Sequence, residues 1–85
     1  MIEPEKIVEK IQQALPDADV KVQDLTGTKD HYKARVVAAQ FEGENRVSRH
    51  RMIYEALSEE MKGPIHALTL EVYTPGEWEE KSGAN

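Results

Sequence analysis

Three histidines are the residues of this 85-residue chain best suited to chemistry near neutral pH. His50 lies in a basic run, Arg49-His50-Arg51, whereas His66 lies in an apolar segment, Ile65-His66-Ala67-Leu68, and His31 precedes an alternating apolar stretch. Imidazole is the commonest metal ligand among side chains. The chain has no cysteine, which excludes a thiol nucleophile, a disulfide framework and a cysteine zinc site. A metal site that needs thiolates must therefore take them from a partner.

Length and charge limit the possible classes of function. A single domain of 85 residues buries only roughly 60–65% of its unfolded surface, which leaves a thin core and disfavours a self-contained enzyme. With 16 acidic and 11 basic residues, the net charge of -5 argues against indiscriminate binding to nucleic acid. No basic region precedes an apolar run at the N-terminus, and no apolar run approaches the roughly 18 residues of a membrane span. We expect a cytoplasmic protein without a membrane partner.

The first half of the chain predicts a helix followed by a β-hairpin. A proline lies in the first turn of segment 3–15, and apolar residues recur there at helical spacing until Pro16. Apolar and polar residues then alternate over 20–25 and again over 32–39, which is typical of strands. The polar segment 26–30 between them predicts the turn of the hairpin.

The second half predicts a helix, a strand and a short terminal helix. Ser48 is a candidate N-cap for a helix that runs to Lys62, and Gly63 would end it in the left-handed conformation. Segment 65–73 has the apolar character of a strand, and segment 74–77, Thr-Pro-Gly-Glu, predicts a capping box with proline at the first helical position. We expect the domain to cover 1–80 and a flexible tail to cover 81–85.

This order predicts an α+β fold, α-β-β-α-β(-α), with a three-stranded mixed sheet and helices on one face. A strand–helix–strand connection is almost always right-handed and joins parallel strands. His31 and His66 then lie at the same end of the sheet, on strands that would be about 5 Å apart. The Arg49-His50-Arg51 run would lie at the start of the second helix, about 20 Å from the histidine end.

The ordered set of motifs resembles the BolA family of stress-induced, morphogen-like proteins. The resemblance runs from about residue 7 to residue 78 and rests on Phe41-Glu42-Gly43, Arg49-His50-Arg51, Ile65-His66-Ala67 and Thr74-Pro75-Gly76-Glu77-Trp78. It implies a relative of the type II KH fold and a non-enzymatic adaptor that pairs with a monothiol glutaredoxin. It also implies a [2Fe–2S] cluster shared with the glutaredoxin cysteine and glutathione, so the isolated chain would hold no cofactor.

The same resemblance implies that His66 is a cluster ligand, and it leaves His31 as the candidate for a second ligand. The alternative for His66 is a hydrogen-bonded core histidine, because it shares the strand phase of Leu68, Leu70 and Val72. The loop 26–30 contains neither histidine nor cysteine, so His31 is the remaining candidate there. Its alternative is a polar residue at a strand start, because alternation from Tyr32 would turn it to the face opposite His66.

The basic run suggests a second function, in transcriptional regulation, since some members of this family are described as DNA-binding regulators. Arg46, Arg49, His50 and Arg51 would then bind DNA at the helix start, where free backbone amides also favour phosphate. The alternative is a solvated helix start. The segment Gly43-Glu44-Asn45-Arg46 lacks the second glycine of a KH-type G-x-x-G loop, so we expect weak DNA binding. A third possibility is a KH-like interaction module without metal.

Overall fold

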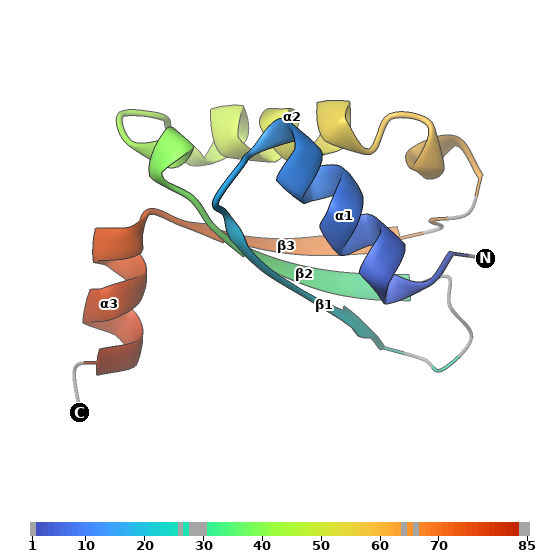
Figure 1. Cartoon of the computed structure of the whole chain (residues 1–85), viewed down its shortest axis with the longest axis horizontal. Helices are drawn as coiled ribbons and strands as arrows, with labels where there is room; N and C mark the ends of the chain where they lie inside the picture. Colours follow the sequence, from blue (N-terminus) through green and yellow to red (C-terminus); the bar gives the residue numbers. More distant parts are fainter. Residues whose placement is uncertain (1, 26, 28–30, 64, 66, 84–85) are drawn as a thin grey trace.

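The computed structural model describes residues 2–25, 27, 31–63, 65 and 67–83. Its elements follow the order that the sequence predicts (Figure 1). They are α1 (Pro4–Ala14), β1 (Asp19–Asp24), β2 (His31–Val37), α2 (Arg46–Ala56), β3 (Ala67–Tyr73) and α3 (Pro75–Gly83), with single 3₁₀ turns at Ala39–Phe41 and Glu60–Lys62. The α+β class with a three-stranded mixed sheet is therefore confirmed.

The strands form one sheet in the order β1-β2-β3, with β2 in the centre. β1 pairs with β2 in the antiparallel sense, as a hairpin requires, and β2 pairs with β3 in the parallel sense. The parallel pair is joined through α2, which is the predicted crossover. Because β2 and β3 run in the same direction, their N-terminal ends lie at one end of the sheet, and α3 follows β3 at the other end (Figure 1).

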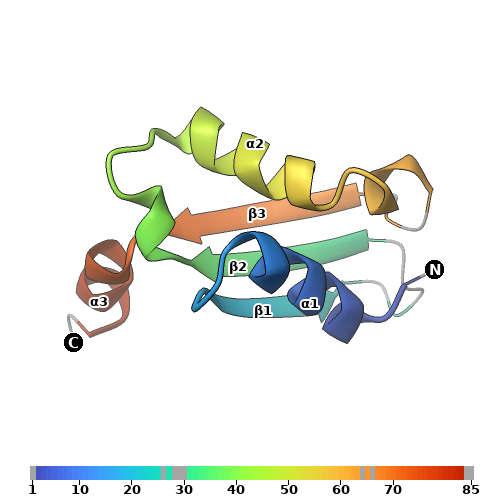
Figure 2. The same ribbon diagram turned by 45° about the horizontal axis from the view of Figure 1, so that its top comes forward.

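α1 and α2 cover one face of the sheet, and the core lies between these two layers (Figures 1 and 2). Alternate residues of β2 point into this core, where Tyr32, Ala34 and Val36 are fully buried. The helices contribute Ile7 and Ile11 from α1 and Ile53 from α2, and Phe41 closes the core beside them. The spacing of these apolar side chains fixes which helix faces pack on the sheet.

Helix α2 begins and ends at positions other than those that the sequence predicts. The side chain of Asn45, not Ser48, is the N-cap, and its Oδ1 accepts a hydrogen bond of 2.8 Å from the Ser48 N–H. The helix ends at Ala56, and a separate 3₁₀ turn covers Glu60–Lys62. Gly63 has a negative φ of -153°, so the left-handed helix end that we expected there does not form.

The predicted capping box at the start of α3 is confirmed. The Thr74 N–H donates to Glu77 Oε1 at 3.0 Å, and the Glu77 N–H donates to Thr74 Oγ1 at 3.1 Å. α3 lies at the end of β3, on the side of the sheet away from α1 and α2 (Figure 1). Its helix continues to Gly83, whereas the sequence suggested fraying from residue 81. Within the described residues, no helix is long and apolar enough to cross a membrane.

Candidate functional site

His31 is the first residue of β2 and is half-buried. In the parallel register its partner is Ala67, which directly follows His66 in the chain. His66 itself lies outside the described residues. The buried residue Tyr32 comes next, so the pleat of β2 turns His31 to the face away from the helices, as strict alternation predicts. The strand, rather than the preceding loop, sets the direction of this side chain.

The ligand chemistry at this end of the sheet is limited to nitrogen and oxygen donors. The chain contains no cysteine, and no group of three histidine, cysteine, aspartate or glutamate side chains within the described part is arranged to hold a metal ion. A closed zinc site needs four ligands, and the described residues at this end of the sheet do not provide four. Imidazole is the metal-binding side chain that the start of β2 offers, at His31.

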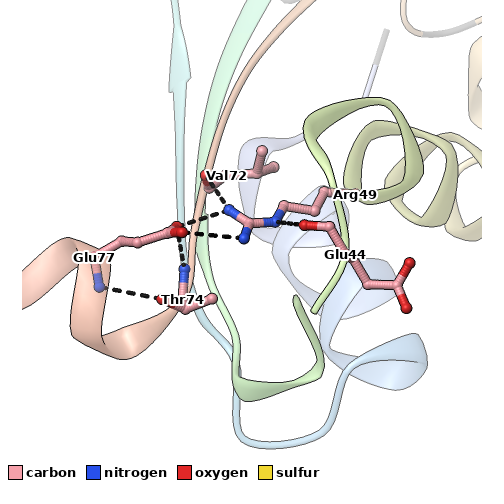
Figure 3. Close-up of polar contacts among 5 residues, drawn as sticks. All are labelled: Glu44, Arg49, Val72, Thr74 and Glu77. Atoms are coloured by element: carbon pink, nitrogen blue, oxygen red, sulfur yellow. Dashed lines mark hydrogen bonds and ion pairs between the residues drawn. The ribbon is translucent and has the colours of Figure 1, made fainter. Parts of the chain in front are cut away.

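Arg49 does not lie free at the start of α2, because its guanidinium is held from three sides (Figure 3). Nη1 and Nη2 contact the two carboxylate oxygens of Glu77 at 2.7 and 3.1 Å. Nε donates to the Glu44 carbonyl at 2.9 Å, and Nη1 lies 3.4 Å from the Val72 carbonyl. The Arg49 side chain is only 12% exposed. It joins α2 to the end of β3 and to α3.

This contact favours the charged forms of both Arg49 and Glu77. The hydrogen bond from Arg49 and the one from the Thr74 backbone lower the pKa of Glu77 from 4.5 to about 2. The same hydrogen bond raises the pKa of Arg49. Bidentate arginine–carboxylate pairs are among the strongest side-chain contacts and fix geometry as well as charge. We therefore assign Arg49 a structural role in holding α3.

The other basic residues of the run remain accessible. Arg46 and Arg51 are exposed, and neither makes an ion pair with another residue that the structure describes. His50 is half-buried and contacts the Tyr54 ring edge-on, with centroids 6.4 Å apart. Arg46 and His50 line a hollow of about 240 Å³ together with residues 70–73 of β3. The accessible charge at the α2 start is therefore carried by Arg46 and Arg51, separately from Arg49.

The two candidate sites lie at opposite ends of the sheet (Figure 1). His31 begins β2, whereas Arg49 contacts Val72 near the end of the parallel strand β3. The sequence predicts His31 and Arg49 at opposite ends of the sheet, as observed, but it does not reveal the contact between Arg49 and Glu77. The capping-box motif singled out Glu77, yet no spacing rule links two residues that are 28 positions apart.

Comparisons with known proteins all identify similarity to one family. Residues 9–77 match the family model described as BolA-like protein. The chain is 37% identical to BolA-like protein 1 of Mus musculus over 84% of its length and 57% of the mouse protein. It is 39% identical to the DNA-binding transcriptional regulator BolA of Escherichia coli (strain K12), over 88% of this chain and 78% of the bacterial protein. The chain thus spans about half the length of the mammalian relatives that it matches.

A solved structure shares the whole fold. The structure of a BolA protein homologue from Coxiella burnetii superposes with a TM-score of 0.80 at 35% sequence identity. The superposition covers 93% of this chain and 99% of the Coxiella chain. The order of helices and strands and the crossover through α2 are therefore shared features.

Proposed function

This chain belongs to the BolA-like protein family, and from that membership we propose that it is a non-enzymatic adaptor, which pairs with a monothiol glutaredoxin and completes a shared [2Fe–2S] cluster. His66 and His31 would be its ligands, and iron sensing or cluster delivery would be its role. A glutathione-ligated cluster requires a reducing compartment, so we place this role in the cytoplasm.

The observation that carries this proposal is the register of β2 and β3. His31 lies directly opposite Ala67, the neighbour of His66 in the chain. Adjacent strands are about 4.8 Å apart, so the backbone of His31 lies beside the start of β3. Nothing in the sequence requires residue 31 to lie beside residue 67; the parallel pairing of β2 and β3 produces this proximity.

The donor set fits half of a [2Fe–2S] cluster. Two histidines can replace two thiolates on one iron, while the other iron keeps thiolate ligands. Since this chain has no cysteine, the glutaredoxin cysteine and glutathione would supply the thiolates. When bound, such a cluster would supply one-electron chemistry or a transferable iron–sulfur unit. The part of this chain would be to present its imidazoles, with that of His31 held at the start of β2 by the pairing of β2 with β3.

A spectroscopic titration tests the proposal. A glutathione-loaded monothiol glutaredoxin with its [2Fe–2S] cluster is titrated with this chain, and visible absorption and circular dichroism are recorded. We expect the spectra to change to those of a mixed cysteine–histidine cluster at a one-to-one ratio, with a raised reduction potential. Unchanged cluster spectra at saturating amounts of this chain would contradict the adaptor role.

We propose DNA binding as a second candidate function, because a relative with 39% identity is named a DNA-binding transcriptional regulator. In this chain the accessible charges for that function are Arg46 and Arg51 at the start of α2, and Arg46 lines the hollow along β3. Arg49 is engaged by Glu77 and contributes little free charge. With a net charge of -5, we expect weak binding, with dissociation constants on the order of 10⁻⁴ to 10⁻⁶ M at physiological salt.

A further inference from the structure

The face of the sheet away from α1 and α2 carries a cluster of basic side chains. Because Ala34 and Val36 of β2 point into the core, Lys33 and Arg35 point to this open face. The strand registers place Lys21 of β1 opposite Arg35 and Gln23 opposite Lys33. Three cations from two neighbouring strands are thereby gathered on one face of an acidic protein.

Two of these cations form an unfavourable pair. Lys21 and Arg35 are direct cross-strand partners in the antiparallel ladder, an arrangement in which like charges destabilise a sheet. Nearby acids compensate in part, since Glu71 lies 3.2 Å from Lys33 and Asp19 lies 3.8 Å from Arg35. Lys21 makes no ion pair with any residue that the structure describes. Positive charge is therefore in excess at this point of the sheet.

One hydrogen-bond donor of Arg35, its Nε, is also unused within the described part of the chain. Its closest carboxylate contact, at 3.8 Å, is too long for a hydrogen bond. Its Nε is buried and lacks a hydrogen-bond partner within the described part of the chain. The guanidinium carbon lies 4.2 Å from the centre of the Trp78 ring, which holds the group in place. The Nε of Arg35 is thus a fixed donor that lacks an acceptor in the described part of the chain.

A hollow of about 350 Å³ lies over this cluster. It is lined by Lys21, Val22, Gln23, Lys33, Arg35 and Glu71. This volume falls at the lower end of the range for small-molecule sites, about 300–1,000 Å³. Three cations and one amide line the hollow against a single carboxylate, so its electrostatic preference is for an anion.

We propose that this hollow binds a small phosphorylated molecule, with Lys21 and Arg35 as its phosphate ligands and Lys33 at its rim. The planar fork of an arginine suits the tetrahedral oxygens of phosphate, and lysine supplies a compact second charge. A phosphate placed here separates the like-charged pair and provides acceptors for Arg35. The cluster is compact, and the net charge of -5 opposes a long polyanion, so the charge distribution favours a small ligand over a nucleic acid.

This site is separate from the proposed DNA surface, whereas it shares the open face of the sheet with His31, two residues before Lys33 on β2. It lies on the face of the sheet opposite α2, which carries Arg46 and Arg51. Its test needs neither iron nor a partner protein. Trp78, the only tryptophan of the chain, packs on Arg35 and therefore reports directly on the occupant.

The experiment titrates the full chain with sodium pyrophosphate and records tryptophan fluorescence together with backbone amide chemical shifts. Sodium chloride at matched ionic strength and sodium citrate are the comparison titrations. We expect a saturable response to pyrophosphate that is centred on β1 and β2 and is absent with chloride and weaker with citrate. Lys21→Gln removes one charge-assisted contact and should weaken binding on the order of tenfold.

The control is Lys62→Gln, which removes an exposed lysine whose ion-pair partner among the described residues is Glu59, on another part of the surface. It should bind pyrophosphate as the parent chain does. Lys21 is exposed and opposes Arg35, so Lys21→Gln should melt at or slightly above the temperature of the parent chain. The proposal is overturned if neither readout saturates at millimolar pyrophosphate, or if Lys21→Gln and Lys62→Gln behave alike. A single-stranded oligonucleotide that shifts the same amides at lower concentration would overturn the choice of a small ligand.

Discussion

Arg49 of α2 and Glu77 of α3 form a bidentate ion pair, with nitrogen–oxygen distances of 2.7 and 3.1 Å. Glu77 Oε1 also accepts the hydrogen bond from the Thr74 backbone that defines the capping box. The Glu77 carboxylate thus accepts a hydrogen bond at the start of α3 and also joins α3 to the distant helix α2. The position of α3 therefore depends on this group, together with the packing of Trp78 on Tyr73 and Arg35.

We predict that acid weakens the attachment of α3. The pKa of Glu77 is about 2 in the folded chain against 4.5 ordinarily, so its ionised form stabilises the fold. This contribution is fully present above about pH 4.5 and is lost as the pH falls toward 2. The difference in melting temperature between the parent chain and Glu77→Gln should shrink over that range. A difference that stays constant between pH 6 and pH 2 would contradict the prediction.

A second prediction concerns the hydroxyl of Thr74, which is buried and accepts the Glu77 N–H. Thr74→Val keeps the shape of the side chain but removes this acceptor. Loss of an N-cap typically costs about 1 kcal/mol, so the melting temperature should fall by about 4–8 °C in a domain of this size. Thr74→Ser retains the hydroxyl and is the matched control. Thermal melts by far-ultraviolet circular dichroism measure both, and equal losses would show that packing rather than capping is decisive.

The start of α3 was predictable because a capping box is a local pattern whose residues lie within one turn. The pairing of Arg49 with Glu77 was not predictable, since it depends on how α2 and α3 meet at the end of β3. A local pattern also failed at the start of α2, where the sequence predicted Ser48 as the N-cap and Asn45 is the cap. Asn45 and Ser48 are both favourable N-caps, and the backbone geometry that decides between them does not appear in either residue type.

Mutation of each residue tests whether Asn45 or Ser48 caps α2. Asn45→Ala removes the acceptor for the Ser48 N–H and should lower the free energy of unfolding by about 1 kcal/mol. Ser48→Ala removes a side chain within the first turn of the helix and should change it by less than about 0.5 kcal/mol. Urea denaturation of both variants checks the ranking. A larger loss for Ser48→Ala would restore the cap that the sequence suggested.

The strands were more predictable than the helix ends, and the reason is physical. Burial of every second residue on β2 is a long-range constraint that leaves a period of two in the sequence, as at Tyr32, Ala34 and Val36. The same period predicts which face of the sheet His31 occupies, whichever strand pairs with β2. The approach of His31 to the start of β3 followed from the crossover rule, whereas the contacts of His66 lie outside the described residues.

Alanine variants of the three histidines form a matched set that tests the proposed cluster. We predict that His66→Ala abolishes the spectral change of the glutaredoxin cluster and that His31→Ala has a smaller effect, because the pleat turns its side chain to the open face. His50→Ala is the control, since His50 lies on α2 beside Tyr54, in the hollow with Arg46. Denaturation midpoints measured beside the spectra separate ligand loss from unfolding. Loss of stability in His66→Ala without a change in cluster spectra would identify a core histidine.

The last prediction separates a DNA-binding role of the basic run from a structural one. The exposed residues Arg46 and Arg51 should contribute to DNA binding, so Arg46→Glu with Arg51→Glu should weaken it and make it less dependent on salt. The slope of log affinity against log salt should decrease by about 0.9 for each phosphate that the variant no longer neutralises. Arg49→Glu places two carboxylates together at Glu77, so it should lower the melting temperature and change the Trp78 fluorescence even without DNA.

Fluorescence anisotropy with a labelled promoter pool, measured at several salt concentrations, provides the affinities, and thermal melts provide the stabilities. Lys62→Gln, distant from α2's first turn, is the charge control. If Arg49→Glu abolishes a nanomolar, sequence-selective complex while its melting temperature is unchanged, then Arg49 leaves Glu77 to bind DNA, and the regulator becomes the primary function. If only the Arg46 and Arg51 substitutions act, and the parent affinity is micromolar, then the interaction with DNA is electrostatic and secondary to the adaptor role.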